Sequence, residues 1–317
     1  MLRDHPDWAE ELAPFRAEAA LAIGDWATVK DMANPPPIAK AFLAIGEGAS
    51  AVPEAVKIAR REIGSGITTR DYGRAYDTIL QLHMLREAEM IHNTDLMITH
   101  PNSEVTTNGT VIARRQAASL VSSLAQRFET SLPSFRAREE ILSKRRTAFR
   151  LVKSQRLQGE LGQAWIQSAK IARKAGYEQT AYSAALQAER AEAPFAFIQR
   201  AKVTRMQGGI LKALREIEHP VQDLVIRSEN ADSVIDLTLD SGDSKKTQED
   251  FRRERNLAKA VLLEARWQNE ADRFEQNGVI RRFKKATQLG ENLEAPFFHL
   301  GRYYDTLAGS TSNVEDM

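Results

Sequence analysis

Residues 232–243 hold the side chains whose types and order most clearly suggest recognition chemistry. Val234, Ile235 and Leu237 are aliphatic and flank Asp236, and acids and serines lie on both sides of them. A peptide of this kind can pair its backbone with the exposed edge of a partner's sheet, with its aliphatic side chains in a groove. Its acids would then face a basic rim on the partner. The chemistry that this segment offers is binding, without catalysis.

This pattern resembles a SUMO-interacting motif. Phosphorylation of Ser241 or Ser244 would add negative charge beside the motif and strengthen the contact. The segment has acids and no bases between residues 229 and 243, so we expect it to be solvated and accessible. An acidic loop with no dedicated partner remains the alternative. The five residues of the motif are Val234, Ile235, Asp236, Leu237 and Thr238.

A second group of charged residues lies on one predicted helix, 134–153, and just beyond it. A basic helical face can bind nucleic acid phosphates, but only Phe135 and Phe149 could serve as aromatic platforms here. Such a face can also simply keep a helix soluble. The basic residues are Arg136, Arg138, Lys144, Arg145, Arg146, Arg150, Lys153 and Arg156.

Residue types that could support catalysis or bind a metal do not form a recognisable motif. The chain has no cysteine, and His83, His92 and His100 lack the spacing of a metal-binding helix. The only short glycine cluster, Gly64-Ser65-Gly66, follows a predicted helix and lacks the lysine of a phosphate loop. We therefore predict no catalytic residue, no metal site and no cofactor.

The composition describes a soluble helical protein. Of 317 residues, 42% are hydrophobic and 27% are charged, and the formal net charge is +1. This balance gives no global field that would attract nucleic acid or an anionic membrane. No segment is apolar over the length of a bilayer span, and residues 1–14 lack the apolar core of a secretory signal. We expect a soluble intracellular protein.

Helical periodicity dominates the chain, and strand patterns are nearly absent. Stretches rich in Ala, Leu, Arg, Glu and Gln are separated by short Gly, Pro or Asn punctuation. The resulting division is N-terminal helical repeats at 1–98, a loop at 99–110, central repeats at 111–219, an acidic disordered loop at 220–248 and C-terminal repeats at 249–317.

An internal repeat sets the fold class. One pattern occurs twice, 32 residues apart: a large residue, then small residues four and seven positions later, then a glycine four positions after the second small residue. We expect the large residue to fill a groove, the small one to let helices approach and the glycine to close the first helix. This pattern and a period near 34 indicate an all-α α-solenoid of tetratricopeptide/HEAT-like hairpins. The first two copies are Trp165, Ala169, Ala172, Gly176, Ala181 and Phe197, Ala201, Thr204, Gly208, Ala213.

The same frame returns twice near the end of the chain. The last copy supplies only the first helix of a hairpin, and stacked repeats need a cap or neighbour to cover their terminal face. We therefore expect the chain to be part of a longer protein, truncated before any kinase domain. These copies are Trp267, Ala271, Phe274, Gly278 and Phe297, Gly301, Tyr304, Ala308, with Tyr303 beside them.

Several motifs in order carry a resemblance to one family. WIQSAKIARKAGYEQTAYSAALQA (165–188) and AKVTRMQGGILKAL (201–214) are similar to the FAT domain of ATR-type checkpoint kinases, within the phosphatidylinositol-3-kinase-related protein kinases. RFETSLPSFRAREEILSKRR (127–146), RFEQNGVIRRFKKATQL (273–289) and FFHLGRYYD (297–305) continue the pattern. The similarity covers nearly the whole chain, is weakest over 1–65 and suggests a fungal member of the family.

The resemblance implies a nuclear, regulatory scaffold in the DNA-damage and replication checkpoint. The implied partners are the kinase domain of the same polypeptide or complex, an obligate ATR-interacting subunit and a second copy, with no direct nucleic acid or membrane contact. It also implies that some arginines of 134–156 pair with acids on adjacent repeats. The family's kinase motifs are missing from this sequence, so we expect no enzyme activity. The alternative is a free-standing tetratricopeptide-like adaptor that binds peptides or proteins.

Overall fold

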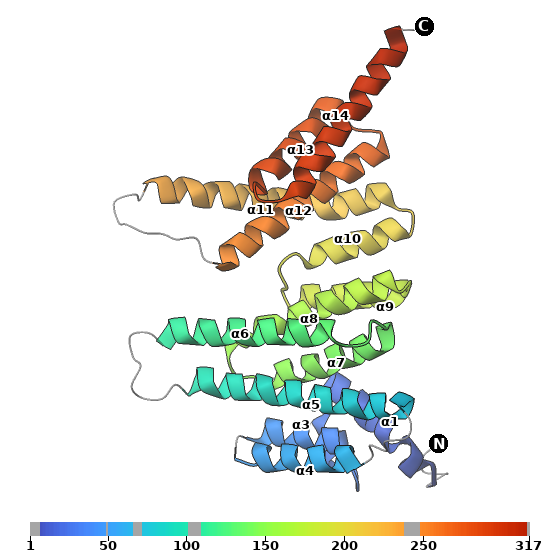
Figure 1. The fold of residues 1–317 in the computed structure, drawn as a ribbon, viewed down its shortest axis with the longest axis vertical. Coiled ribbons are helices and arrows are strands. Elements are labelled where there is room, and N and C mark those ends of the chain that lie inside the picture. The colour runs from blue at the N-terminus through green and yellow to red at the C-terminus, as the bar shows by residue number, and fades with distance from the viewer. Residues whose placement is uncertain (1–6, 49, 66–71, 101–108, 238–247, 316–317) are drawn as a thin grey trace. The chain divides into compact units, whose positions relative to one another are not determined.

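The computed structural model describes residues 7–48, 50–65, 72–100, 109–237 and 248–315. Every regular element in these ranges is an α-helix, and none of them is a strand (Figure 1). The predicted all-α class of helical-hairpin repeats is confirmed. None of the described helices is apolar over a length that could cross a bilayer. The chain divides into two compact units, Met1–Pro194 and Phe195–Met317.

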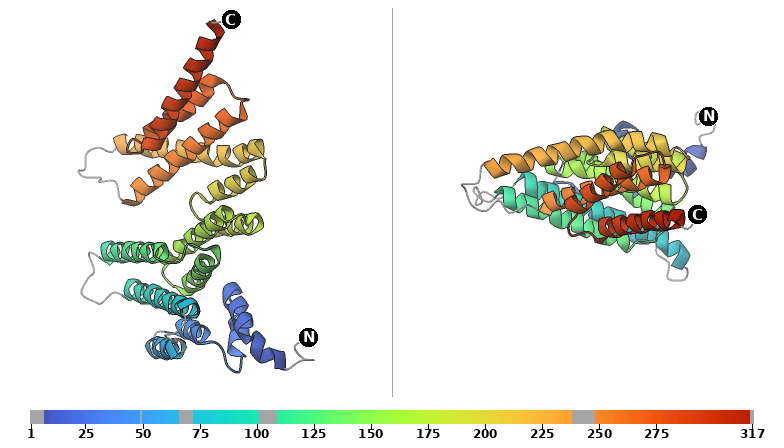
Figure 2. Two further views of the ribbon diagram at one scale, coloured as in Figure 1. Left: turned by 45° about the vertical axis from the view of Figure 1, so that its right-hand side comes forward. Right: turned by 90° about the horizontal axis from the view of Figure 1, so that it is seen from above.

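Unit 1 holds the first nine of the described helices. Most consecutive helices pack against each other, but α7 packs on α5 and α8 rather than on α6, and α5 and α6 lie side by side in all views (Figures 1 and 2). The helices are α1 (Asp7–Ile23), α2 (Trp26–Lys30), α3 (Pro37–Glu47), α4 (Val52–Ser65), α5 (Tyr72–Thr99), α6 (Gly109–Glu129), α7 (Phe135–Leu151), α8 (Gln155–Lys174) and α9 (Glu178–Arg190).

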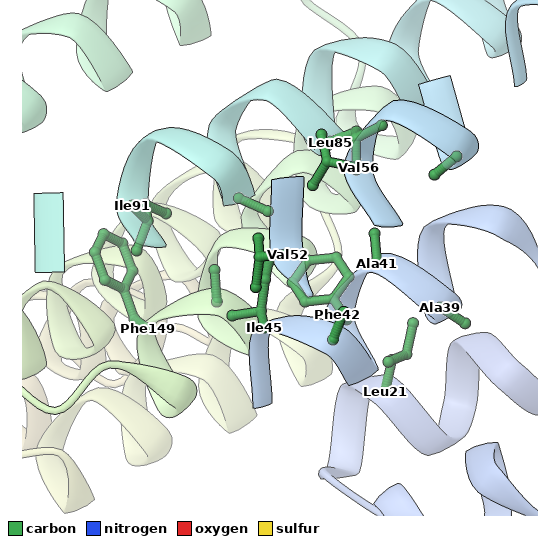
Figure 3. Close-up of a cluster of buried hydrophobic side chains, with 14 of the residues drawn as sticks. Leu21, Ala39, Ala41, Phe42, Ile45, Val52, Val56, Leu85, Ile91 and Phe149 are labelled. Carbon is green, nitrogen blue, oxygen red and sulfur yellow. The ribbon is translucent and has the colours of Figure 1, made fainter. Parts of the chain in front are cut away.

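The main core of unit 1 gathers side chains from helices far apart in sequence (Figure 3). Phe42 of α3 is fully buried, and Leu21 of α1, Val56 of α4 and Leu85 of α5 belong to the same cluster. Phe149 of α7 belongs to it as well. Each such side chain contributes about 1.5–3 kcal/mol when removed from water. The core thus fixes α7 against the N-terminal hairpins.

The hairpin of α8 and α9 shows how the predicted repeat works. Gly176 has φ +82°, the left-handed conformation that glycine adopts most easily. The N–H of Tyr177 donates to the carbonyl of Ala172 at 2.9 Å, which closes α8 with a Schellman-type turn. Ala169 is buried in a cluster with Ala184 of α9, so small side chains do allow these two helices to approach.

Unit 2 holds the remaining five of the described helices. Gly208, 32 residues after Gly176, has φ +84° and closes the first of them. Trp267, Phe283 and Tyr303 are buried in the core of this unit. The helices are α10 (Ala196–Met206), α11 (Ile210–Leu237), α12 (Gln248–Ala271), α13 (Gln276–Leu289) and α14 (Glu294–Glu315).

The predicted acidic loop at 220–248 is wrong over its first part. Helix α11 continues through Pro220 to Leu237. Val221 is fully buried, and Leu224 and Val225 pack against the same core, so the apolar stripe of α11 continues past the proline. Burial of this stripe offsets the cost of a proline in a helix. Residues 238–247 lie outside the described residues.

Two other boundaries differ from the sequence prediction. Helix α5 extends to Thr99, and residues 101–108 of the predicted 99–110 loop lie outside the described residues. The two units meet in sequence at Pro194, inside the 111–219 segment that we predicted as one group of repeats. Glu192 and Phe195 both have positive φ there, which breaks helical continuity between α9 and α10.

Candidate functional site in the charge network of helix α7

Helix α7 carries the basic residues that the sequence singled out, and three of them are buried. Ser134 caps the helix, because its hydroxyl accepts a hydrogen bond from the N–H of Ala137 at 3.3 Å. Lys144, Arg145 and Arg146 each keep at most 7% of their surface exposed. A buried cation is costly unless it is paired and hydrogen-bonded, so the partners define what this helix does.

Arg145 forms a two-point ion pair with Glu87 of α5. Its Nε and Nη2 donate to the two carboxylate oxygens at 2.6 and 2.7 Å. Nη2 also donates to the carbonyl of Leu124 in α6 at 2.7 Å. One guanidinium therefore links α5, α6 and α7, and its parallel hydrogen bonds permit only one relative placement of these helices.

Two further groups surround the Glu87 carboxylate. His83 Nε2 lies 2.9 Å from Glu87 Oε1, and Arg127 Nη2 donates to the carbonyl of His83 at 3.3 Å. Burial alone would raise the pKa of Glu87. Hydrogen bonds from Arg145 and His83, with their charges, outweigh burial and lower that pKa below 4.5. Glu87 is therefore an ionised structural group and a poor proton donor.

The aromatic ring of Phe128 lies beside the same cluster. The guanidinium carbons of Arg138 and Arg145 lie 5.0 and 5.3 Å from its centroid. Cations near an aromatic ring are attracted by its quadrupole, which gives Arg145 a second anchor on α6.

Arg146 connects α7 to α8. It pairs with Glu139 of its own helix at 2.7 Å and donates to the hydroxyl of Ser168. Its guanidinium carbon lies 3.9 Å from the ring centroid of Trp165. Trp165, which was predicted to fill a groove between helices, is partly buried beside Ala169 and Ala184 and is a cation–π partner of Arg146.

Further contacts of α7 reach α1. Lys144 Nζ lies 3.3 Å from Glu18, and the hydroxyl of Thr147 donates to the carbonyl of Leu21 at 3.2 Å. Arg150 donates to the carbonyl of Ala22. These carbonyls belong to the last turn of α1, where a helix leaves its carbonyl groups unpaired.

The expectation that some arginines of 134–156 pair with acids on adjacent repeats is met by Arg145, which pairs with Glu87 of α5, and Lys144 pairs with Glu18 of α1 in addition. These side chains are committed to α5 and α1 and are not free to contact phosphates. Arg136 and Arg156 lie exposed at the two ends of the segment. The cluster of Glu87, Arg145, Arg146, Trp165 and their neighbours, the α7 charge network, is thus an organising centre that joins helices.

Asp95, which the sequence pattern did not single out, completes this region. Its carboxylate accepts the N–H groups of Lys153 and Ser154 at 3.0 and 2.8 Å, at the start of α8. The aspartate comes from α5, far away in sequence, so no local capping pattern could reveal it. Its helical spacing from Glu87 was the only available signal.

The first two copies of the predicted repeat lie in the hairpins of α8 and α9 and of α10 and α11. All four alanines that we assigned to close helix contacts are fully buried, and both glycines have positive φ. The large residues of the two copies are partly buried. These residues are Trp165, Ala169, Gly176 and Ala181, then Phe197, Ala201, Gly208 and Ala213.

The later copies are placed wrongly by the sequence frame. Gly278, which was predicted to close a helix, lies in the first turn of α13. The residue of positive φ that follows the end of α12 is Asp272, with φ 48°. Phe297, Gly301 and Tyr304 are exposed on α14, although they were predicted to pack. The buried aromatic residues of this end are Trp267 and Tyr303. The faces were misassigned because α14 turns Tyr303 toward α12 and α13.

The predicted SUMO-interacting residues lie at the end of α11 and just beyond it. The backbone of Val234–Leu237 belongs to the last turn of this helix, and Thr238 lies outside the described residues. Strand addition would require this turn to unwind. Whether the motif binds SUMO stays a prediction.

Other candidates for chemistry have structural surroundings. His83 lies against Glu87, His100 is exposed and Ser65 donates to the carbonyl of Glu62. His92 is buried, and its Nε2 has no partner among the described residues. No group of three potential metal ligands occurs within the described ranges.

Stacked hairpins and buried charge contacts define a helical repeat protein, and sequence comparison identifies its family. The FAT domain model matches residues 45–315, and the chain belongs to the FAT domain family. The serine/threonine-protein kinase ATR of Arabidopsis thaliana is 27% identical over 244 residues, which are 74% of this chain and 9% of that protein. The ATR kinase of Oryza sativa subsp. indica is 26% identical over 241 residues, with the same two coverages.

The chain is therefore similar to a FAT segment of ATR-type kinases. It spans about 9% of the length of the curated relatives that it matches. These relatives are plant proteins, so the expected fungal origin stays a prediction.

Proposed function

We propose that this chain is a non-catalytic regulatory scaffold within an ATR-like serine/threonine kinase that acts in the DNA-damage and replication checkpoint. The observation that carries the proposal is the FAT match over residues 45–315, together with ATR kinases as relatives over 74% of the chain. The sequence holds none of the family's kinase motifs, which supports a role in positioning rather than in phosphoryl transfer.

The α7 charge network supports the same role. It commits charged side chains of α7 to contacts with Glu18 of α1, Glu87 of α5, a backbone carbonyl of α6 and the Trp165 ring of α8, as a scaffold that must hold one geometry would. A packed arrangement of this kind responds to force as a rigid element. The proposed scaffold would transmit such force between its partners.

The partners that we propose follow from the family. They are the kinase domain of the same polypeptide or complex, the obligate ATR-interacting subunit, and a second copy of the chain. SUMO, bound at Val234–Thr238, is a further proposed partner. We propose nuclear localisation on the same basis, and no direct nucleic acid or membrane contact.

Reading the transcript beyond the codon for Met317 is the first test. The proposal expects an open frame that continues into kinase motifs. A stop codon, with no kinase sequence in the same complex, would favour the free-standing adaptor instead.

A cellular test uses the charge network. Replacing Arg145 with Met in the genomic copy should sensitise cells to replication arrest, because the buried Glu87 would lose its two-point partner. Arg60→Met, which removes an exposed contact to Glu89, is the matched control and should leave survival unchanged. Normal checkpoint signalling in cells that lack residues 1–317 altogether would contradict the proposal.

A further inference from the structure

Unit 2 contains a cavity of about 320 Å³ between α12, α13 and α14. This volume falls at the lower end of the range for small-ligand sites. Its walls are unusual for a contact between packed helices, because cationic side chains line it. The cavity takes no part in the α7 charge network, and a binding site there is independent of the proposed scaffold role.

Three basic groups meet at this cavity from two helices. Arg266 lies on α12, and His299 and Arg302 lie on α14. The pKa of His299 is lowered by burial and then by the charges of Arg266 and Arg302, so both guanidinium groups lie near its imidazole ring. Like charges brought together in this way favour an anion between them.

Both arginines are available to a ligand. They are solvent-exposed, and within the described residues the side chains of Arg266 and Arg302 have no ion-pair partner. Glu270 also lines the cavity, but it is paired with Arg205 on α10. Its charge is thereby largely neutralised, and the net character of the cavity stays positive.

The α14 residues that line the cavity share one helical face. His299, Arg302, Tyr303 and Thr306 follow the spacing i, i+3, i+4, i+7. On the same helix Phe298 is 64% exposed. Helix α14 thus presents His299, Arg302 and Thr306 at the cavity beside the buried Tyr303, while the ring of Phe298 stays in solvent.

The base of the cavity is aromatic. Trp267, Phe283 and Tyr303 line it, and the rings of Phe283 and Tyr303 have centroids 5.4 Å apart. Burial, followed by the charge of Asp272, raises the pKa of Tyr303, so its hydroxyl stays protonated and can donate a hydrogen bond. The hydroxyl of Thr306 donates to the carbonyl of Arg302 and keeps its lone pairs.

We propose that this cavity binds a phosphate group carried by a small molecule with an apolar or aromatic body. Two guanidinium groups and an imidazole match a doubly charged oxyanion better than a single carboxylate, since guanidinium pairs with phosphate through parallel hydrogen bonds. The aromatic base would hold the body of the ligand against Trp267.

The test is isothermal titration of the 317-residue chain with sodium pyrophosphate and with phenyl phosphate in phosphate-free buffer. We expect each probe to bind saturably, with one molecule per chain. Phenyl phosphate should bind more tightly per phosphate group than pyrophosphate, because its ring can contact the aromatic base of the cavity. Arg266→Gln and Arg302→Gln should each weaken binding about tenfold or more. Arg281→Gln changes an exposed arginine of α13 outside the cavity and should change affinity less than about twofold.

Circular dichroism melts of the three variants show whether folding is intact. We expect them to match the parent, because neither cavity arginine has an ion pair to lose within the described residues. The proposal is overturned if neither probe binds saturably. Equal weakening by Arg281→Gln also overturns it, because binding would then reflect general charge.

Discussion

Glu87 of α5 and Arg145 of α7, 58 positions apart in the sequence, form a two-point ion pair whose side chains are 2% and 5% exposed. Breaking a buried pair by removing one partner is far more costly than removing both, because the remaining charge stays buried. This asymmetry gives the first prediction.

Arg145→Met should lower the free energy of unfolding by about 3–5 kcal/mol. The double variant Glu87→Leu/Arg145→Met should recover most of that loss, because neither charge of this pair is then left buried without the other. Urea denaturation followed by circular dichroism at neutral pH measures both. Arg60→Met at the exposed pair with Glu89 is the control and should change stability by less than about 1 kcal/mol. A double variant no more stable than Arg145→Met alone would show that the pair is not the stabilising unit.

The second prediction concerns Glu264, a fully buried carboxyl on α12. Arg282 Nε lies 3.2 Å from its Oε1, while Oε2 has no hydrogen-bond partner among the described residues. Burial raises the pKa of Glu264 to about 7 despite the charge of Arg282, and Glu218 adds to the rise. The folded state therefore keeps a proton that the unfolded state, with a pKa near 4.5, has already released.

The sign follows from this proton balance. Between about pH 4.5 and about pH 7 the folded state binds more protons, so stability falls as pH rises, by about 3 kcal/mol in total. Glu264→Gln should remove this fall of stability with pH. The variant should then be more stable than the parent at alkaline pH. Chemical denaturation across that range measures the difference. Glu291→Gln, at an exposed site, should keep the slope of the parent. An unchanged slope in Glu264→Gln would contradict the assignment.

The hairpins could be predicted from the sequence because their signals are local. Gly176 and Gly208 mark helix ends through a conformation that few other residues adopt, and Ala169 and Ala201 mark close contacts. The continuation of α11 was hidden by Pro220, although Val221 keeps the helical stripe going.

The charge network could not be predicted in detail for a different reason. Glu87 and Arg145 look like ordinary solvated residues of two amphipathic helices, and only tertiary packing brings them together. Asp95 and the backbone of Ser154 are related in the same way. Periodicity shows which face of a helix a residue lies on, but it does not show what covers that face.

The third prediction tests the SUMO-interacting motif. A peptide of residues 228–246 should bind SUMO saturably in a fluorescence titration, and replacing both Val234 and Ile235 with alanine should abolish binding. The full chain should bind more weakly than the peptide, because the last turn of α11 would have to unwind first. A parent peptide without saturable binding would rule the motif out.

The last prediction compares two glycines of α8. A Cβ added at Gly162 would lie 2.6 Å from Ala193 Cβ and 3.2 Å from its Cα, whereas a Cβ at Gly159 would meet nothing within 4 Å. Gly162→Ala should therefore destabilise unit 1 by about 1–3 kcal/mol, because the contact is too close and lies partly against backbone. Gly159→Ala should stabilise it by about 0.5–1 kcal/mol, because alanine loses less backbone entropy in a helix.

Thermal and urea unfolding of the two variants should show opposite shifts in stability, although the substitution and the helix are the same. Helix propensity alone would stabilise both, so only the close approach of Ala193 can separate them. Gly162 thus reports whether the end of unit 1 packs against α8 as tightly as the structure places it. Equal stabilisation by both changes would mean that the segment around Ala193 can move away, and that α8 and α9 are held by the alanines of their hairpin alone.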